Sequence, residues 1–211
     1  YTNKSSDNLP ATGYNNQSIA YFMIFQNPNV DLSWYRPIWK KGQEQIDQVH
    51  PFSSFIDNPY LIAYEMTNGV KSNAFLANMA ATYTINKKFD LMLRSGIDLS
   101  SEIRKQQRPY SSANYLRGFY KEQNIQDYEI NSDFLLSYKD KIGSDINVTA
   151  SIGGNAMSTN YNRMDASVIG LVIPGVYMLS NGVGTPEVVN IARNKKVNSL
   201  YRSEEHTSEL Q

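Results

Sequence analysis

The stretch that most constrains the fold is residues 128–155, YEINSDFLLSYKDKIGSDINVTASIGGN, because apolar and polar side chains alternate along it. Apolar residues recur at every second position on both sides of a central polar turn: Tyr128, Ile130, Phe134, Leu136 and Tyr138, then Ile146, Val148, Ala150 and Ile152. Successive side chains of a strand point to opposite faces, so this period predicts two strands, each with one apolar and one polar face. The stretch therefore predicts a long antiparallel hairpin.

The same alternation occurs earlier in the chain. Residues 74–85 carry one apolar set and residues 89–100 carry another, and Asn86–Lys88 forms the turn between them. The two sets are Phe75, Ala77, Met79, Ala81, Tyr83 and Ile85, then Phe89, Leu91, Leu93, Ile97 and Leu99. A fifth strand is predicted to begin near Lys195.

The segments between these hairpins are long and polar. Ser101–Asp127 and Ala156–Asn194 lack a sustained apolar period, so both are predicted to be loops. Residues 1–69 are rich in turn-forming residues and are predicted to be mostly loop, with a short helix near Ser18–Gln26. Short turns would then alternate with long loops along the chain.

Strand length separates two architectures. The apolar stretches run about 11 or 12 residues, whereas strands of soluble proteins average about five or six and strands that cross a bilayer need about 9 to 11. Tyr128 and Tyr138 bracket one apolar stretch, as aromatic residues do at membrane interfaces. We therefore expect an all-β chain whose antiparallel strands form part of a transmembrane β-barrel with long extracellular loops. The barrel is incomplete because four or five strands cannot close one. The alternative is a soluble β-sandwich that binds carbohydrate.

Composition argues against several other functions. Twenty basic residues balance twenty acidic ones, which does not favour a nucleic-acid partner. The chain has no cysteine and two histidines, His50 and His206. His50 precedes Pro51 in a predicted loop, so neither a nucleophile activated by a base nor a clustered metal site is indicated. We expect no enzyme activity, no metal and no cofactor.

Two groups of residues are candidates for function. The aromatic residues Trp34, Tyr35 and Trp39 lie in the polar segment DLSWYRPIWKK, where flat rings suit stacking on sugars or packing against a protein lid. The alternative is that they pack this loop onto its neighbours. Asp90, Arg94 and Asp98 share the polar register of one strand and are predicted to face the barrel lumen, where they would be solvated or paired.

The last ten residues, RSEEHTSELQ (202–211), match the translation of a common sequencing adapter. We interpret them as an artefact, and Tyr201 as the last residue of the natural sequence that was read. The alternative is a frayed polar terminus.

Five motifs in order resemble the barrel region of SusC/RagA-type TonB-linked outer-membrane transporters: DNPYLIAYE (57–65), NSDFLLSYK (131–139), ASIGGN (150–155), GLVIPGVYMLSN (170–181) and KKVNSLY (195–201). The resemblance covers roughly residues 21–201 and implies that residues 1–201 are part of such a barrel. It implies a large barrel with an N-terminal plug in a Gram-negative outer membrane. It further implies import of glycans or peptides, a SusD-like surface lipoprotein as lid, and energy from the TonB complex through regions outside this sequence.

Overall fold

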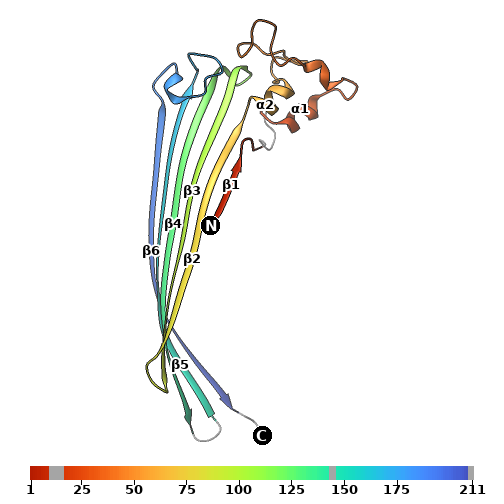
Figure 1. Ribbon diagram of the computed structural model, residues 1–211. Helices are drawn as coiled ribbons and strands as arrows, with labels where there is room; N and C mark the ends of the chain where they lie inside the picture. Colours follow the sequence, from red (N-terminus) through yellow and green to blue (C-terminus); the bar gives the residue numbers. More distant parts are fainter. Residues whose placement is uncertain (10–16, 143–145, 209–211) are drawn as a thin grey trace.

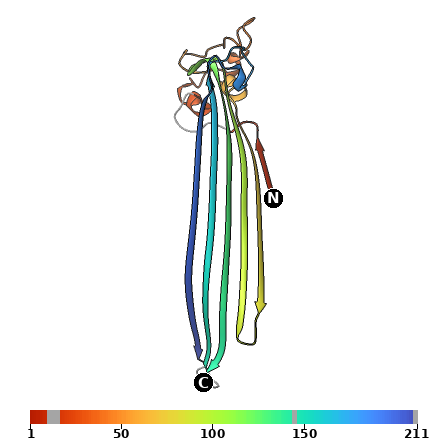
Figure 2. The ribbon, with the colours of Figure 1, turned by 90° about the vertical axis from the view of Figure 1, so that its left-hand side faces the viewer.

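The computed structural model describes residues 1–9, 17–142 and 146–208. In these residues, six strands form one antiparallel sheet in which each strand pairs with the next along the chain (Figures 1 and 2). The strands are β1 (Thr2–Ser6), β2 (Asn68–Thr84), β3 (Phe89–Ser112), β4 (Tyr115–Ile142), β5 (Ile146–Ile169) and β6 (Glu187–Ser208). The sheet is open, which confirms the prediction of an all-β antiparallel fold that does not close on itself. The predicted turn at residues 143–145 and the tail residues 209–211 lie outside the described residues.

Residues 17–66 form a small lobe beside the upper end of the sheet (Figure 1). It contains the helices α1 (Ile19–Phe25) and α2 (Pro59–Tyr64) and the 3-10 helix η1 (Leu32–Tyr35). The side chain of Ser18 caps α1 by accepting a hydrogen bond from the backbone N–H of Tyr21 at 3.0 Å, which confirms the predicted short helix. The core of the lobe consists of Tyr21, Phe22, Tyr35, Ile56, Leu61, Ile62 and Met66. Among the described residues, no helix is both long and apolar enough to cross a membrane.

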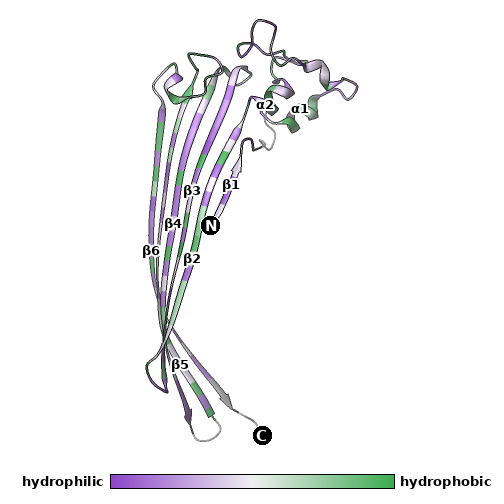
Figure 3. Cartoon of the chain, viewed as in Figure 1, coloured by the Kyte–Doolittle hydropathy of each residue, from purple (hydrophilic) through white to green (hydrophobic). Residues whose placement is uncertain are grey.

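The strand register gives the sheet two different faces in its lower half, which ends at the level where Leu99 pairs with Tyr128. The face that we call the apolar face carries Phe75, Ala77, Met79, Ala81, Tyr83, Phe89, Leu91, Leu93, Ile97, Leu99, Tyr128, Ile130, Phe134, Leu136, Tyr138, Val148, Ala150 and Ile152. Their neighbours in sequence point to the opposite side, the polar face. Figure 3 shows the resulting mixture of apolar and polar residues along each strand. The predicted alternation is therefore confirmed in β2 to β5.

No second layer covers the apolar face in the described part of the chain. Leu93 is 53% exposed, Met79 75% and Ile152 54%, although all three are apolar. The two clusters of buried apolar residues lie elsewhere, in the lobe and around Tyr120, Val168 and Leu171 near the upper end of the sheet. The described residues thus form a single sheet and not the sandwich considered as the alternative.

The upper half of the sheet corrects the predicted loops. Ser101–Asp127 is not a loop: β3 continues to Ser112, β4 starts at Tyr115, and only Ala113 and Asn114 connect them. β5 likewise continues to Ile169, and β6 begins at Glu187 and not near Lys195. The long connection at this end is therefore residues 170–186, which includes the 3-10 helix η2 (Leu179–Asn181). The prediction that short turns and long loops alternate throughout is wrong, because the β3–β4 connection is short.

The physical reason is that the apolar period is lost above Leu99, although Tyr120 and Val168 at the upper end of the same face are buried. On the continuation of the apolar face, Ser101 pairs with Gln126 and Lys105 pairs with Glu122. Backbone hydrogen bonds between neighbouring strands hold these residues in the sheet, whatever the side chains are. A search for apolar alternation cannot detect strands of this kind.

Two adjacent glycines allow aromatic rings to lie close to β5. A Cβ atom on Gly153 would collide with the ring of Tyr201 and lie 2.8 Å from the carbonyl oxygen of Phe134. A Cβ atom on Gly154 would lie 2.7 Å from the ring of Phe134, on the other face of the sheet. The space that side chains would take at these two glycines is thus occupied by aromatic rings, Tyr201 on one face and Phe134 on the other. On the apolar face, a groove of about 730 Å³ runs beside Phe134 and Gly154.

The lobe is fastened to the sheet by buried polar groups. The carboxylate of Asp57, which is fully buried, accepts hydrogen bonds from Gln48 Nε2 at 2.7 Å, from the backbone N–H of Ala113 at 2.8 Å and from Ser112 Oγ at 3.1 Å. Arg108 of β3 donates to Gln17 Oε1 at 2.7 Å and to the carbonyl of Thr67 at 3.1 Å. Burial raises the pKa of Asp57. These contacts join the tip of the β3–β4 hairpin to the lobe.

Candidate functional site

Two rows of side chains cross the polar face at the junction of the two halves, and each row changes from acidic to basic. In the first row, Asp98 of β3 pairs with Glu129 of β4, which is followed by Thr159 of β5 and Lys195 of β6. The second row contains Ser100, Asp127, Tyr161 and Arg193 on the same strands. Because these residues share one face, their charges lie in order across the sheet.

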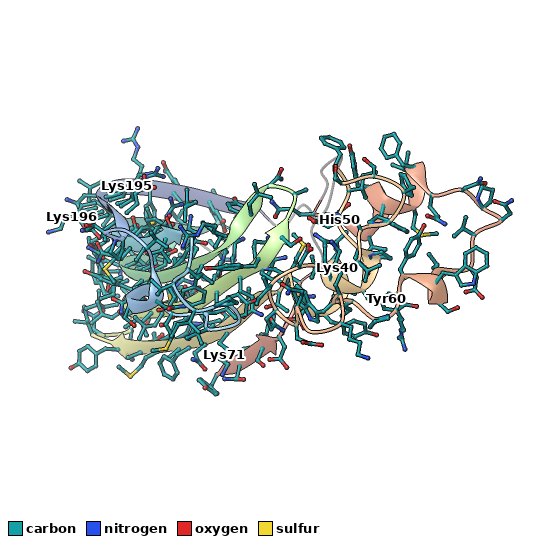
Figure 4. All side chains as sticks on the ribbon, turned by 90° about the horizontal axis from the view of Figure 1, so that it is seen from above. Lys40, His50, Tyr60, Lys71, Lys195 and Lys196 are labelled. Atoms are coloured by element: carbon teal, nitrogen blue, oxygen red, sulfur yellow. The ribbon has the colours of Figure 1, made fainter. Side chains whose placement is uncertain are left out.

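These residues line a hollow of about 750 Å³ over the polar face, together with Ala74 of β2. Its acidic wall consists of Asp98, Asp127 and Glu129, and its basic wall of Arg193 and Lys195. Figure 4, from above, places Lys195 at the β6 side of the sheet, whereas Lys40, His50 and Tyr60 lie in the lobe. The guanidinium carbon of Arg193 lies 5.9 Å from the ring centroid of Tyr161, on the floor between the walls.

The charges of the two walls do not neutralise one another. Among the residues that the structure describes, no ion pair involves any of the five charged residues of the hollow. Asp98 and Glu129 are also direct cross-strand neighbours, and like charges in this position destabilise a sheet. Within the described residues, the hollow therefore holds separated charges that form no ion pairs.

The other two residues predicted to face the lumen lie lower on the same face and are paired. The guanidinium of Arg94 donates to Asp133 Oδ2 from Nε at 2.9 Å and from Nη2 at 2.8 Å. Asp90 accepts hydrogen bonds from Thr84 Oγ1 at 2.9 Å and from Lys139 Nζ at 3.2 Å. The structure thus places Asp90, Arg94 and Asp98 on one face, but only Asp98 belongs to the hollow.

The three aromatic candidates of the lobe are separated by their burial. Trp34 is 67% exposed, whereas Tyr35 is buried, donates its hydroxyl hydrogen to Gln26 Oε1 at 2.9 Å and meets the ring of Phe22 edge to face. Trp39 is partly buried against the core of the lobe. Trp34 is thus the one of the three whose ring is available to a ligand or partner, and Tyr35 and Trp39 help to hold the lobe together.

Sequence reasoning missed four of the five charged residues of the hollow: Asp127, Glu129, Arg193 and Lys195. Asp127 and Arg193 fell within predicted loops, and the other two lay beside the boundaries of those loops. A usable signal was present in β6, where Arg193 and Lys195 are two positions apart and so share a face. Within the described ranges, no group of three or more histidine, cysteine, aspartate or glutamate residues converges as metal ligands would.

Comparison with known proteins supports the architecture. No family model matches the sequence, and no curated protein matches it. Solved structures of the RagAB peptide importer are similar: one in the closed-closed state (TM-score 0.66, 16% identity over 77% of this chain), one described as the RagAB peptide transporter (0.64, 16%, 78%) and one in the open-open state (0.63, 19%, 78%). The chain spans 19% of the length of each of those chains. The fold of this chain is therefore similar to that of part of the RagAB chains in these structures.

Proposed function

We propose that this chain forms part of the wall of a SusC/RagA-type transporter in the outer membrane of a Gram-negative cell, with its apolar face in lipid and its polar face toward an aqueous lumen. The observation that supports this most strongly is the exposed apolar face of the lower half. Leu93 and Met79 would be costly to expose to water across a whole sheet, but they are suited to hydrocarbon.

The height of the apolar band supports the same assignment. Tyr128 and Tyr138 lie ten positions apart on β4, and at about 3.3 Å per residue and a tilt of about 40° they are separated by roughly 25 Å of height. That is the height of the apolar band of outer-membrane barrels. Ring contacts between Phe89 and Tyr138, with centroids 5.0 Å apart, place aromatic side chains at the lower rim.

The transport cycle would involve parts that lie outside this sequence. We propose that energy comes from the TonB complex, that a SusD-like surface lipoprotein acts as lid, and that the substrate is a peptide or an oligosaccharide. The chain itself would form barrel wall and extracellular loops, without catalytic residues. Trp34 offers an exposed aromatic ring at the lobe for the lipoprotein or the substrate. Trp34→Ala in the intact transporter should weaken lipoprotein or substrate binding, whereas Tyr35→Ala should instead destabilise the lobe.

The wall assignment is tested by spin labels on β3 in the intact protein, reconstituted in bilayers. The chain has no cysteine, so single cysteines can be introduced at chosen positions without native thiols in this segment. Labels at Leu93 and Leu99 should be more accessible to oxygen, which concentrates in lipid. Labels at Arg94 and Ser100 should be more accessible to a water-soluble nickel complex.

The upper half of the same strand provides the matched control. Labels at Ile103 and Arg104 lie on opposite faces, but both should be accessible to the nickel complex because this part of the strand is predicted to lie outside the bilayer. Equal accessibility of all labels at 93, 94, 99 and 100 would contradict the proposed wall.

A further inference from the structure

We propose that the lobe is a movable strap across the upper end of the sheet. It turns as one unit about its attachment to β2, and a latch of buried polar groups at the tip of the β3–β4 hairpin holds it closed. The motion itself does not require a barrel. In the proposed wall the strap would cover part of the lumen mouth, and this role rests on the proposed function.

The lobe is a packing unit of its own. Its buried core is made of lobe residues alone, among them Phe22 and Leu61. The second buried cluster, around Tyr120 and Leu171, belongs to the sheet and the β5–β6 connection. In the described ranges, no cluster of buried apolar residues spans the two. Units that meet through polar groups are expected to move relative to each other. The lobe can therefore move without opening its own core.

The attachment of the lobe is narrow. The described stretches on either side of it leave the sheet next to each other: Ser6 of β1 pairs with Val70 of β2, and the backbone N–H of Leu9 donates to the carbonyl of Asn68 at 2.8 Å. The guanidinium of Arg108 holds the same point by donating to Asn68 Oδ1 at 2.8 Å. Two adjacent stretches of backbone can act as one hinge, so the lobe can turn here as a body.

The latch joins Asp57 and Gln48 of the lobe to the hairpin tip. Gln48 Nε2 donates to the carbonyl of Ser111 at 2.5 Å, and the carboxylate of Asp57 accepts hydrogen bonds from Ser112 and Ala113. Among the described residues, no lysine or arginine lies within ion-pair distance of Asp57, which is fully buried. A buried carboxylate without a counter-ion regains its hydration when it reaches water. This gain offsets part of the hydrogen bonding that keeps the latch closed.

A strained second contact joins the strap to the β5–β6 connection. The side chain of Gln45 lies against Gly175, where an added Cβ would be 3.3 Å from Gln45 Cγ. Gln45 has a φ of 63°, a left-handed conformation that costs free energy in a residue with a side chain. Its Oε1 atom is buried and has no hydrogen-bond partner among the described residues. Because a buried acceptor without a partner loses free energy relative to water, this contact favours release.

The strap thus has one fixed end and one end that can be released. Backbone pairing and Arg108 hold the end at Asn68, whereas residues 45–57 carry the contacts that can open. Figure 1 shows the lobe beside the upper end of the sheet, next to the hairpin tip. Arg108 continues the register of the polar face, so in the proposed wall the strap turns on the lumen side.

The test measures how fast a maleimide modifies single cysteines in the intact protein. Ser112→Cys lies beneath the latch, and Ile62→Cys lies in the lobe core, where Ile62 is 5% exposed. Ser112→Cys should react about tenfold faster when it is combined with Asp57→Ala, because the latch has lost its acceptor. Ile62→Cys should stay protected in the same background, because the lobe moves as a unit.

Asp57→Asn is the matched control for the latch. It keeps an acceptor for Gln48 and Ala113, so Ser112→Cys should react nearly as slowly in this background as in the unchanged one. Two results would overturn the inference. One is equal reactivity of Ser112→Cys in all three backgrounds, which means that Asp57 holds nothing closed. The other is that Ile62→Cys gains reactivity together with Ser112→Cys, which means that the lobe unfolds and does not turn.

A distance measurement provides a second readout. Spin labels at Trp34 in the lobe and at Ser100 on the polar face should give one distance in the unchanged protein and a second, additional distance with Asp57→Ala. One and the same distance in both proteins would also overturn the inference. The proposed wall survives such a failure if the labels on β3 alternate between lipid and water. If the strap moves but those labels do not alternate, the motion stands and its role at a lumen mouth falls.

Discussion

The lower and upper halves of β3 belong to one continuous strand with the same two neighbours, yet they are built for different surroundings. Below Leu99 one side of the strand is apolar and the other polar, whereas above it Ser101 and Lys105 continue the apolar side with polar groups. The backbone ladder is the same in both halves. The comparison shows that one backbone ladder can run through both halves, while the side chains set the solvent to which each half is suited.

The largest expected difference between the halves is the response to a charge on the apolar side. Leu93→Arg should destabilise the reconstituted protein by about 2 to 4 kcal/mol, because the guanidinium would lie within the lipid. Ile103→Arg places the same residue on the same side of the same strand in the upper half and should cost less than about 1 kcal/mol. Denaturant titrations of the protein in bilayers measure both. Equal destabilisation by the two substitutions would mean that the two halves of the strand are surrounded by the same solvent.

The next largest effect concerns packing in the lower half. Gly153→Ala should cost about 1 to 3 kcal/mol, because the added methyl group meets the ring of Tyr201 and a backbone carbonyl. Gly184→Ala, in the loop of the upper end, is the control, since an added Cβ there meets nothing within 4 Å. Thermal unfolding followed by circular dichroism compares them. A Gly153→Ala protein as stable as the control would show that Tyr201 moves aside freely.

A smaller and more local effect is expected where the lobe meets the upper half. Asp57→Ala leaves the buried donors of Gln48 and Ala113 without an acceptor, which should weaken docking of the lobe by about 1 to 3 kcal/mol. Hydrogen exchange should show lost protection in residues 48–58 and unchanged protection in the lower half of β3. Loss of protection throughout the sheet would mean that the lobe and the lower half unfold together.

The same contact should depend on pH. Burial raises the pKa of Asp57, so docking should be strongest below about pH 4 and weaken as the pH rises through the raised pKa. Asp57→Asn keeps an acceptor for Gln48 and Ala113 but does not ionise, so its docking should not change over this range. Hydrogen exchange of residues 48–58, corrected for intrinsic rates, measures the difference. A wild-type profile as flat as that of Asp57→Asn would contradict it.

The smallest effect is expected for exposed ion pairs, and here the halves should agree. Lys139 bonds Asp90 in the lower half at 3.2 Å, and Lys105 bonds Glu122 in the upper half at 3.3 Å. Both lysine side chains are more than half exposed, so replacing either with Gln should change stability by less than about 1 kcal/mol. A much larger cost for Lys139→Gln in denaturant titrations would indicate a polar face that is not open to water.

Sequence reasoning succeeded where one face of a strand had to be apolar. The lower halves of β2 to β5 and the turn before Phe89 follow from that requirement alone. The upper halves could not be found in this way, because both of their faces carry polar residues. Gln106 and Glu122, for example, lie on opposite faces, and pairing with the neighbouring strands holds each of them in the sheet. A strand without a buried face leaves no period in its own sequence.

The candidate residues show a similar limit. Trp34 and Tyr35 are adjacent in the sequence, yet one is exposed and the other is in the core of the lobe. Which of two neighbouring rings is buried depends on how the chain folds over α1 and α2. The composition of the segment does not predict this. Asp98 was placed on the correct strand, but its partners in the hollow come from three other strands that the sequence could not align.

Residues 202–208 continue β6 along the lower half of the sheet. Arg202 pairs with Ile152 and Glu204 pairs with Ala150, so both charged residues occupy apolar-face positions of the lower half. In the proposed wall Arg202 would face lipid, and Glu204 would lie at the lower rim, level with Tyr138. The interpretation of residues 202–211 as an artefact stays a prediction.

The short connection at Ala113 and Asn114 has a mechanical consequence. One backbone ladder joins the two ends of this hairpin, because β3 and β4 are paired from Phe89 and Tyr138 at the lower rim to Ser112 and Tyr115 at the tip. A displacement at the tip would therefore reach the lower half through the paired strands themselves. The lobe, in contrast, is joined to the hairpin by side-chain contacts of Asp57 and Arg108, so it can separate from the hairpin without breaking the strand pairing.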